Sequence, residues 1–158
     1  MNQNIKKKSV EVVSTELVLP GDTNHHGTIF GGKTLAMMDM TGALAAMQFC
    51  NEDVVTASFE SVDFKKPIKE GDIAEVKARV VYTSSKSMVV KIDVYKVGKF
   101  HSRKDYTCGG YATFVAIDAN GEPKNIPALK VSSPRDKELW DIGKNIKSRA
   151  MERVKSRK

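Results

Sequence analysis

Asp39 is the residue in this chain whose setting most suggests chemistry. It lies among Met37, Met38 and Met40, and Lys33 is the only other charge on the same predicted helix. An isolated ionised carboxylate is very costly to bury, and Asp is a poor residue in mid-helix because its side chain competes for backbone hydrogen bonds. A lone carboxylate in apolar surroundings is a candidate general base. The alternative interpretation is a carboxylate that faces water or caps a neighbouring loop.

Gly31 and Gly32 form a glycine pair where that helix is expected to begin. The first turn of a helix leaves backbone N–H groups unpaired and carries a partial positive charge. Glycine lets a ligand oxygen approach this backbone closely. The pair is therefore a candidate oxyanion site, and the alternative is a tight turn from loop to helix.

The spacing of these two features favours a site shared between subunits. Gly31 and Asp39 are about 12 Å apart along a helix that rises ~1.5 Å per residue. One substrate carbonyl cannot easily sit on the first N–H groups and also lie near Asp39 of the same chain. If both act on one substrate, we expect Asp39 to come from a second copy of the chain.

The histidines and cysteines give weaker signals. His25 and His26 are adjacent, so their side chains point in different directions, and His101 is the only other imidazole. Neither Cys50 nor Cys108 has metal-ligand spacing with them, and the chain contains no G-x-S-x-G or P-loop motif. We expect no metal site and two packed thiols.

The hydrophobic pattern predicts an α+β arrangement. A mostly apolar stretch from Gly31 to Phe49 predicts one buried helix, about 28 Å long at ~1.5 Å per residue. Alternation of apolar and polar residues predicts strands, and several strands in succession favour an antiparallel sheet with the helix on one face. The predicted strands cover residues 10–19, 54–64, 74–82, 90–94 and 111–117.

The positive charge of the chain is concentrated near the C-terminus. The net charge is +7, and residues 130–158, with ten Lys/Arg and four Asp/Glu, contribute +6 of it. Ser133, Pro134 and Asp136 are typical of a helix start. The basic segment could meet a phosphate-bearing cofactor, nucleic acid or a membrane surface, or it is simply a solvated helix. An apolar stripe runs along it: Leu139, Ile142, Ile146, Ala150 and Val154.

The length of 158 residues is that of one domain. We expect a flexible N-terminus over residues 1–8, a domain over 9–128 and a basic helical extension over 129–158. No apolar run approaches the ~18 residues of a membrane-spanning helix, and no apolar stretch of a secretory signal follows the first lysines. Two cysteines are too few for a disulfide framework. The expectation is a cytoplasmic protein without membrane insertion.

Several segments resemble acyl-CoA thioesterases of the hotdog fold, of the bacterial YciA and mammalian brain acyl-CoA hydrolase type. The family signature is matched by the segment PGDTNHHGTIFGGKTLAMMDMTGALAA. The shared residues are a Pro, an Asn and a Gly, followed by Ile-Phe-Gly-Gly and then Met-Asp. The family's second strand and turn resemble VTASFESVDFKKPIKEGD, and a later strand start resembles SSKSMVV. The resemblance covers residues 10–118.

This resemblance implies a curved antiparallel sheet wrapped around one long central helix, here followed by a basic C-terminal helix. It also implies a homodimer with sites at the subunit interface, and dimers that assemble into hexamers. Asp39 falls on the catalytic carboxylate, and Asn24 falls on the group of the opposite subunit that binds water or the carbonyl. Gly31 and Gly32 fall on the helix start that polarises the thioester carbonyl.

Hydrolysis of a thioester is coherent with these residues. A thiolate leaves readily because an ordinary thiol has a pKa of ~8.5, so one base and one carbonyl-stabilising site suffice. We expect Asp39 to activate water, or to attack directly and form an anhydride, while Asn24 and the glycine N–H groups stabilise the oxyanion. Coenzyme A is part of the substrate, and no further cofactor is expected. Its candidate ligands are Ser84, Ser85, Lys86 and Arg135.

Two other functions compete with this interpretation. A non-catalytic acyl-CoA-binding or sensing module would use the same fold, but the intact pair of Asn24 and Asp39 argues against it. A nucleic-acid-binding protein would use the basic helix, but Trp140 is the only tryptophan and no interleaving of aromatic and basic residues occurs. We expect no nucleic-acid partner.

Overall fold

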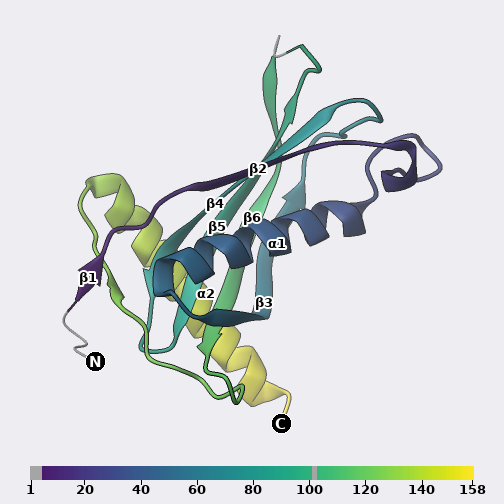
Figure 1. The fold of residues 1–158 in the computed structure, drawn as a ribbon. Coiled ribbons are helices and arrows are strands. Elements are labelled where there is room, and N and C mark those ends of the chain that lie inside the picture. The colour runs from purple at the N-terminus through teal and green to yellow at the C-terminus, as the bar shows by residue number, and fades with distance from the viewer. Residues whose placement is uncertain (1–4, 101–102) are drawn as a thin grey trace.

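The computed structural model describes residues 5–100 and 103–158 and contains a five-stranded antiparallel sheet curved around one helix, α1 (Gly31–Cys50) (Figure 1). The strand order is β2-β4-β5-β6-β3, so β2 and β3 form the two edges. The predicted α+β arrangement is confirmed. The strands are β2 (Val12–Leu17), β3 (Asp53–Phe64), β4 (Ile73–Thr83), β5 (Ser87–Val97) and β6 (Lys104–Ile117).

Helix α1 packs against the sheet through small and apolar residues. Gly42 allows the closest approach, because a Cβ there would lie 2.8 Å from Ile92 Cδ1 and 3.1 Å from the Phe114 ring. The helix ends at Asn51, which adopts a left-handed conformation with φ 57°. Met40 on the opposite side stays 69% exposed. One apolar side of α1 is therefore left uncovered by its own chain.

Strand β4 alternates as predicted and buries Ala74, Val76, Ala78 and Val80 against the core. In β3 the predicted alternation fails, because register shifts interrupt the strand and leave Val55 exposed. Strand β6 is longer than predicted, since it begins at Lys104 rather than at residue 111. Gly109 and Gly110 lie inside this strand, where larger side chains cover them: Tyr106 covers Gly109, and Val62 covers Gly110. A Cβ at Gly109 would clash with the Tyr106 hydroxyl at 2.1 Å.

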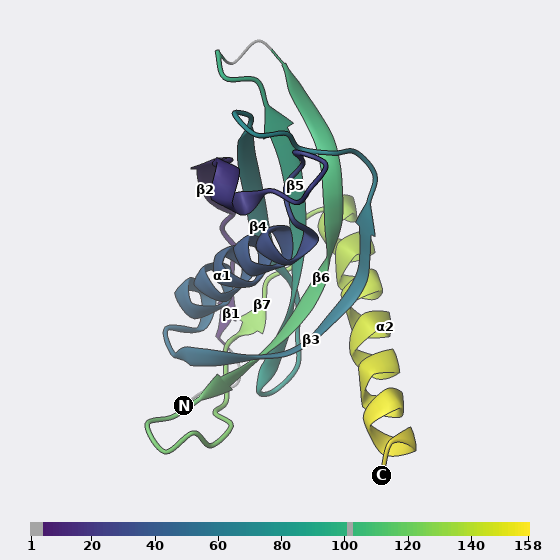
Figure 2. The same ribbon diagram turned by 90° about the vertical axis from the view of Figure 1, so that its right-hand side faces the viewer.

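Helix α2 (Pro134–Ser156) lies on the face of the sheet opposite α1 (Figure 2). Its start is capped as predicted, since Ser133 Oγ accepts a hydrogen bond from the Asp136 N–H at 3.0 Å. Leu139 and Ile146 are buried against the sheet, as the stripe predicts. Val154, at the end of the stripe, is 61% exposed.

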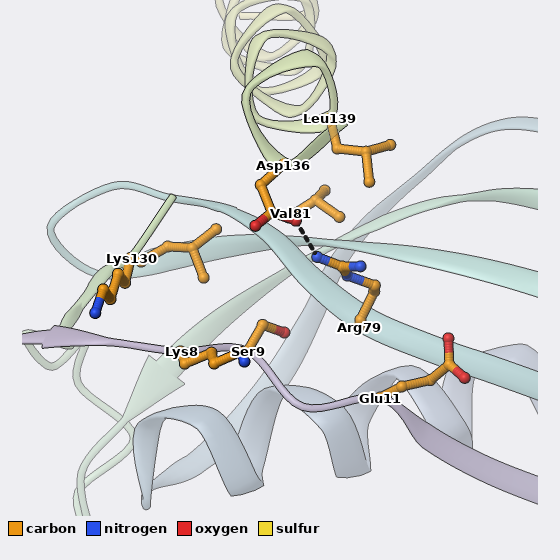
Figure 3. A pocket seen from close by; sticks show the side chains of 9 residues that line it. Lys8, Ser9, Glu11, Arg79, Val81, Lys130, Asp136 and Leu139 are labelled. Carbon is orange, nitrogen blue, oxygen red and sulfur yellow. Dashed lines mark hydrogen bonds and ion pairs between the residues drawn. The ribbon is translucent and has the colours of Figure 1, made fainter. Parts of the chain in front are cut away.

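An ion pair fixes the N-terminal end of α2 to the sheet. Arg79 of β4 contacts Asp136 at 2.8 Å, and this hydrogen bond holds the pKa of the Asp136 carboxyl below its ordinary value. The pair borders a cavity of about 160 Å³. Figure 3 shows that Lys8 and Ser9, from the segment that leads into β2, face the same cavity.

The N-terminal segment, expected to be flexible over residues 1–8, contains a short strand. Strand β1 (Lys6–Lys7) pairs in parallel with β7 (Ala128–Leu129). The N–H of Lys130 donates to the Lys7 carbonyl at 2.9 Å. Residues 1–4 lie outside the described part of the chain. Pairing with a strand more than 120 residues away therefore orders part of this segment.

Candidate active site

Asp39 lies half-buried on α1 and faces the edge strand β3. Its Oδ1 accepts a hydrogen bond from Thr56 Oγ1 at 2.6 Å. The neighbouring Met37 and Met38 are buried in the core of the chain, whereas Met40 is exposed. The carboxylate is thus held by one hydroxyl, at the border between the core and the uncovered side of α1.

Thr56 was not among the residues singled out from the sequence. Its β3 position pairs with Phe114 of β6, which is buried against α1, so Thr56 is on the α1 side of the sheet. Register shifts follow between Thr56 and Ser58 and again between Glu60 and Asp63. The alternation of apolar and polar residues in β3 would have placed Thr56 on the polar side, away from α1, because the register shift after Thr56 cannot be read from the sequence.

Asn24 is fixed by its own loop. Its Oδ1 accepts hydrogen bonds from the His26 N–H at 2.9 Å, the Thr28 N–H at 3.3 Å and the Thr28 hydroxyl at 3.2 Å. The amide oxygen is therefore engaged, and the NH₂ group of the same amide remains as a donor. A fixed amide donor is suited to bind a carbonyl oxygen.

The start of α1 provides further donors. The helix begins at Gly31, and Phe30 at the N-cap supplies no side-chain hydrogen bond. The first backbone N–H groups of a helix have no intrahelical partner. Gly31 lines a cavity of about 360 Å³ together with Thr34 and Phe64. Packing also favours glycine at position 32, because a Cβ there would lie 2.3 Å from the Phe30 ring.

Within one chain, Asn24 and the start of α1 are separated from Asp39 and Thr56. Among the described residues, the side-chain hydrogen bonds of Asn24 go to residues 26–28 and that of Asp39 goes to Thr56. Gly31 and Asp39 are two helical turns apart, about 12 Å at ~1.5 Å per residue.

The expected ligands of coenzyme A lie elsewhere in the chain. Ser84, Ser85 and Lys86 form the turn after β4, and Ser84 Oγ is 2.6 Å from Ser87 Oγ. The loop before Gly31 bonds to residues 68 and 69, just before β4 begins. The length of β4, roughly 35 Å for eleven residues, separates the two ends. Arg135, at the start of α2, pairs with Glu138 at 2.8 Å.

Both cysteines are buried, as predicted. Burial raises the pKa of the Cys108 thiol to about 11 and also raises that of Cys50. A thiol that stays protonated is a poor nucleophile. Neither residue is therefore equipped for covalent catalysis.

The side chains of His25 and His26 do not point apart as expected, since their ring centroids lie 3.8 Å from each other in the loop near Asn24. His101 lies outside the described residues. Within residues 5–100 and 103–158, no group of His, Cys, Asp or Glu is arranged to hold a metal ion. Neither helix of the described chain is both long and apolar enough to cross a membrane.

Comparison with known proteins identifies the family. The Thioesterase superfamily matches residues 26–99. A Bacillus subtilis protein named as an uncharacterized acyl-CoA thioester hydrolase is 37% identical over 122 residues, which are 77% of this chain and 71% of the relative. The chain belongs to the acyl-CoA thioester hydrolases. These are enzymes, and the resemblance to the YciA type is confirmed by a Salmonella typhimurium relative of that name, 33% identical over 74% of this chain and 90% of its own.

Solved structures of the family share the hotdog fold of this chain. An apo-hexameric acyl-CoA thioesterase superposes with a TM-score of 0.84 at 39% identity, over 91% of this chain and 92% of the other. An acyl-CoA hydrolase from Staphylococcus aureus, in complex with butyryl coenzyme A, superposes with a TM-score of 0.83 at 37% identity, over 93% and 90%. The chain spans only 34% of the mouse cytosolic acyl coenzyme A thioester hydrolase, to which it is 28% identical.

Proposed function

We propose that this protein hydrolyses fatty acyl-CoA to a free fatty acid and coenzyme A, in a site shared by two copies of the chain. Asn24 and the N–H groups of Gly31 and Gly32 bind the thioester carbonyl of the substrate. Asp39 of the second copy acts as general base, or as nucleophile, from the opposite side. Ser84, Ser85, Lys86 and Arg135 stay candidate ligands of coenzyme A.

The single observation that carries this proposal is the arrangement of donors and base. Asn24 has its amide oxygen engaged and its NH₂ group available, next to a helix start with free N–H groups. Asp39 is held by Thr56 and lies two helical turns further along α1 than Gly31. The donors suit an oxyanion. Asp39 can act on a carbonyl bound by these donors only if the two come from different chains.

The uncovered surface supports a dimer. Strand β3 is an edge strand of twelve residues, and exposed edges pair readily with another chain. Val55 and Phe64 on β3 and Met40 and Leu44 on α1 are large apolar residues left exposed. Pairing of two β3 strands would cover this surface and carry Asp39 toward the loops of the other copy.

The relatives offer further support. In the Staphylococcus aureus enzyme, an asparagine, an aspartate and a threonine have each been replaced by alanine, at positions separated by 15 and 17 residues. Asn24, Asp39 and Thr56 have the same two separations. Thioesterases of this fold have been solved as hexamers, which fits three such dimers.

The reaction needs few groups. Asp39 removes a proton from water, which attacks the carbonyl carbon, and the negative charge that develops on the oxygen is met by Asn24 and the helix start. The intermediate then collapses, and the C–S bond breaks. The coenzyme A thiolate leaves without a dedicated acid, because a thiol has a pKa of ~8.5.

The test is release of thiol from a series of acyl-CoA substrates by the wild-type protein and by Asp39→Asn. We expect turnover on at least one chain length and a loss of at least 100-fold in the variant, the usual size of a general-base effect. Asp39→Asn keeps the size of the side chain, so its oligomer should be intact. Saturable acyl-CoA binding with no turnover at any length would contradict the proposal and favour a binding module.

A further inference from the structure

A groove lies far from α1, on the other face of the sheet. It runs between the C-terminal half of α2 and strands β3 and β6 and has a volume of about 450 Å³. Figure 2 shows that half of α2 beside β3 and β6, with α1 on the opposite side of the sheet. The proposed reaction makes no use of this groove.

Two buried hydroxyls in the groove have no hydrogen-bond partner. Ser58 of β3 and Thr113 of β6 are directly opposite each other in the strand register. Both hydroxyl oxygens are inaccessible to solvent and unpartnered among the described residues, and Thr113 as a whole is 2% exposed. Buried polar side-chain atoms are nearly always hydrogen-bonded in folded proteins. A pair of unsatisfied hydroxyls side by side therefore indicates a missing acceptor.

Lys147 of α2 brings a positive charge to the same groove. Its pKa is lowered by burial alone, and no carboxylate within the described chain forms an ion pair with it. The neighbouring Arg153 differs, because it pairs with Glu60 of β3. Two hydroxyls and one ammonium thus line the same groove without an acceptor among the described residues, which is the composition of an oxyanion site.

The rest of the groove is apolar, apart from Arg153 and three exposed cationic residues near the end of α2: Lys155, Arg157 and Lys158. Ala57, Ala150, Met151 and Val154 line it. Met151 and Val154 remain 51% and 61% exposed, although they continue the apolar stripe of α2. A ligand for this groove therefore carries a negative head group and an apolar chain.

We propose that the groove binds a fatty carboxylate. The carboxylate accepts hydrogen bonds from Ser58, Thr113 and Lys147, and the alkyl chain lies along Met151 and Val154. The carboxylate is placed at Lys147 because, of the cationic residues that line the groove, only Lys147 is both partly buried and without an ion pair among the described residues. Arg153 pairs with Glu60, and the remaining three are exposed to solvent. A free fatty acid, the product of the proposed reaction, has this chemistry, but the groove is inferred independently of that reaction.

Titration calorimetry of the full chain with decanoate tests the proposal. We expect saturable binding that weakens at least tenfold in Lys147→Met and threefold to tenfold in Thr113→Val. Lys144→Met is the matched control, because Lys144 is on the same helix but contacts Trp140 outside the groove. Its affinity should equal that of the wild type.

Two further titrations distinguish binding in this groove from binding at the proposed active site and from binding of other anions. Asp39→Asn should keep the part of decanoate binding that Lys147→Met removes, since the groove is on the other face of the sheet. Inorganic phosphate and coenzyme A are titrated in parallel, and tighter binding of either, lost in Lys147→Met, would overturn the carboxylate assignment. Equal decanoate affinity in all variants would overturn the site itself.

Folding does not confuse the result. Thr113→Val keeps the shape of the side chain and removes an unpaired hydroxyl, so its unfolding midpoint should equal or exceed that of the wild type. Lys147→Met keeps most of the alkyl stem that packs in the groove. A variant whose midpoint is unchanged and whose affinity is also unchanged counts against the proposal.

Discussion

Thr56 holds the carboxylate on which the proposed reaction depends. Its hydroxyl donates to Asp39 at 2.6 Å, so it orients the carboxylate. We predict that Thr56→Val lowers kcat about tenfold and leaves KM nearly unchanged, because orientation affects the chemical step more than binding. Steady-state thiol release measures both constants. Thr15→Val, on the opposite edge strand, is the control, and a Thr56 variant with wild-type kcat would show that the hydrogen bond is irrelevant to catalysis.

Cys108 makes stability depend on pH in the alkaline range. Its pKa in the folded state is about 11, raised from an ordinary 9.0 by burial. Between these values the unfolded chain has lost the thiol proton and the folded chain keeps it, so rising pH favours unfolding. We predict that Cys108 removes roughly 2 kcal/mol of stability between pH 9 and pH 11, at about 1.4 kcal/mol per pH unit.

Urea unfolding of wild type and Cys108→Ala under reducing conditions measures this effect. The variant leaves a small cavity and is less stable at pH 7. The gap between the two proteins should shrink as the pH rises from 9 to 11, since only the wild type carries the thiol. Parallel stability curves across that range would mean that the thiol titrates normally.

At the scale of elements, Gly143 controls how closely α2 approaches the sheet. A Cβ at this position would lie 2.5 Å from the Tyr82 Cβ and 3.4 Å from Val81 Cγ2. Helix propensity alone would make Gly143→Ala stabilising by about 1 kcal/mol. The overpacking costs typically 1–3 kcal/mol, so we predict a net loss of about 1 kcal/mol in denaturant unfolding. Ser148→Ala, exposed on the same helix, should change stability by less than ~0.5 kcal/mol, and a stabilised Gly143→Ala would show that α2 can move away.

The elements that local signals define were predictable from the sequence. Helix α2 was predicted from the capping residue Ser133 and from the apolar stripe through Leu139 and Ile146. Helix α1 was predicted from the apolar stretch that begins at Gly31. The first half of β6 was missed, because its glycine pair resembles a turn until Tyr106 is seen to cover it. The pairing of β1 with β7 was missed as well, since its partners are far apart in the sequence.

At the scale of the whole molecule, the candidate residues were predictable and their contacts were not. Asn24, Asp39 and the pair Gly31 and Gly32 stand out by residue type and spacing. The contact of Asp39 with Thr56 depends on how the helix lies across β3, which periodicity does not give. The register shift after Thr56 also turns Ser58 toward the face that α2 covers. One strand thus borders both the proposed active site and the fatty-carboxylate groove.

Subunit complementation tests the central claim, that one active site takes residues from two chains. Asn24→Ala and Asp39→Ala, each expected to be inactive alone, are mixed in equal amounts, dissociated and reassembled. Random pairing makes half the dimers mixed, and each mixed dimer has one intact site of two, so we predict recovery of about a quarter of wild-type thiol release. No recovery, with mixed oligomers shown to form, would place Asn24 and Asp39 in the same-chain site and contradict the account.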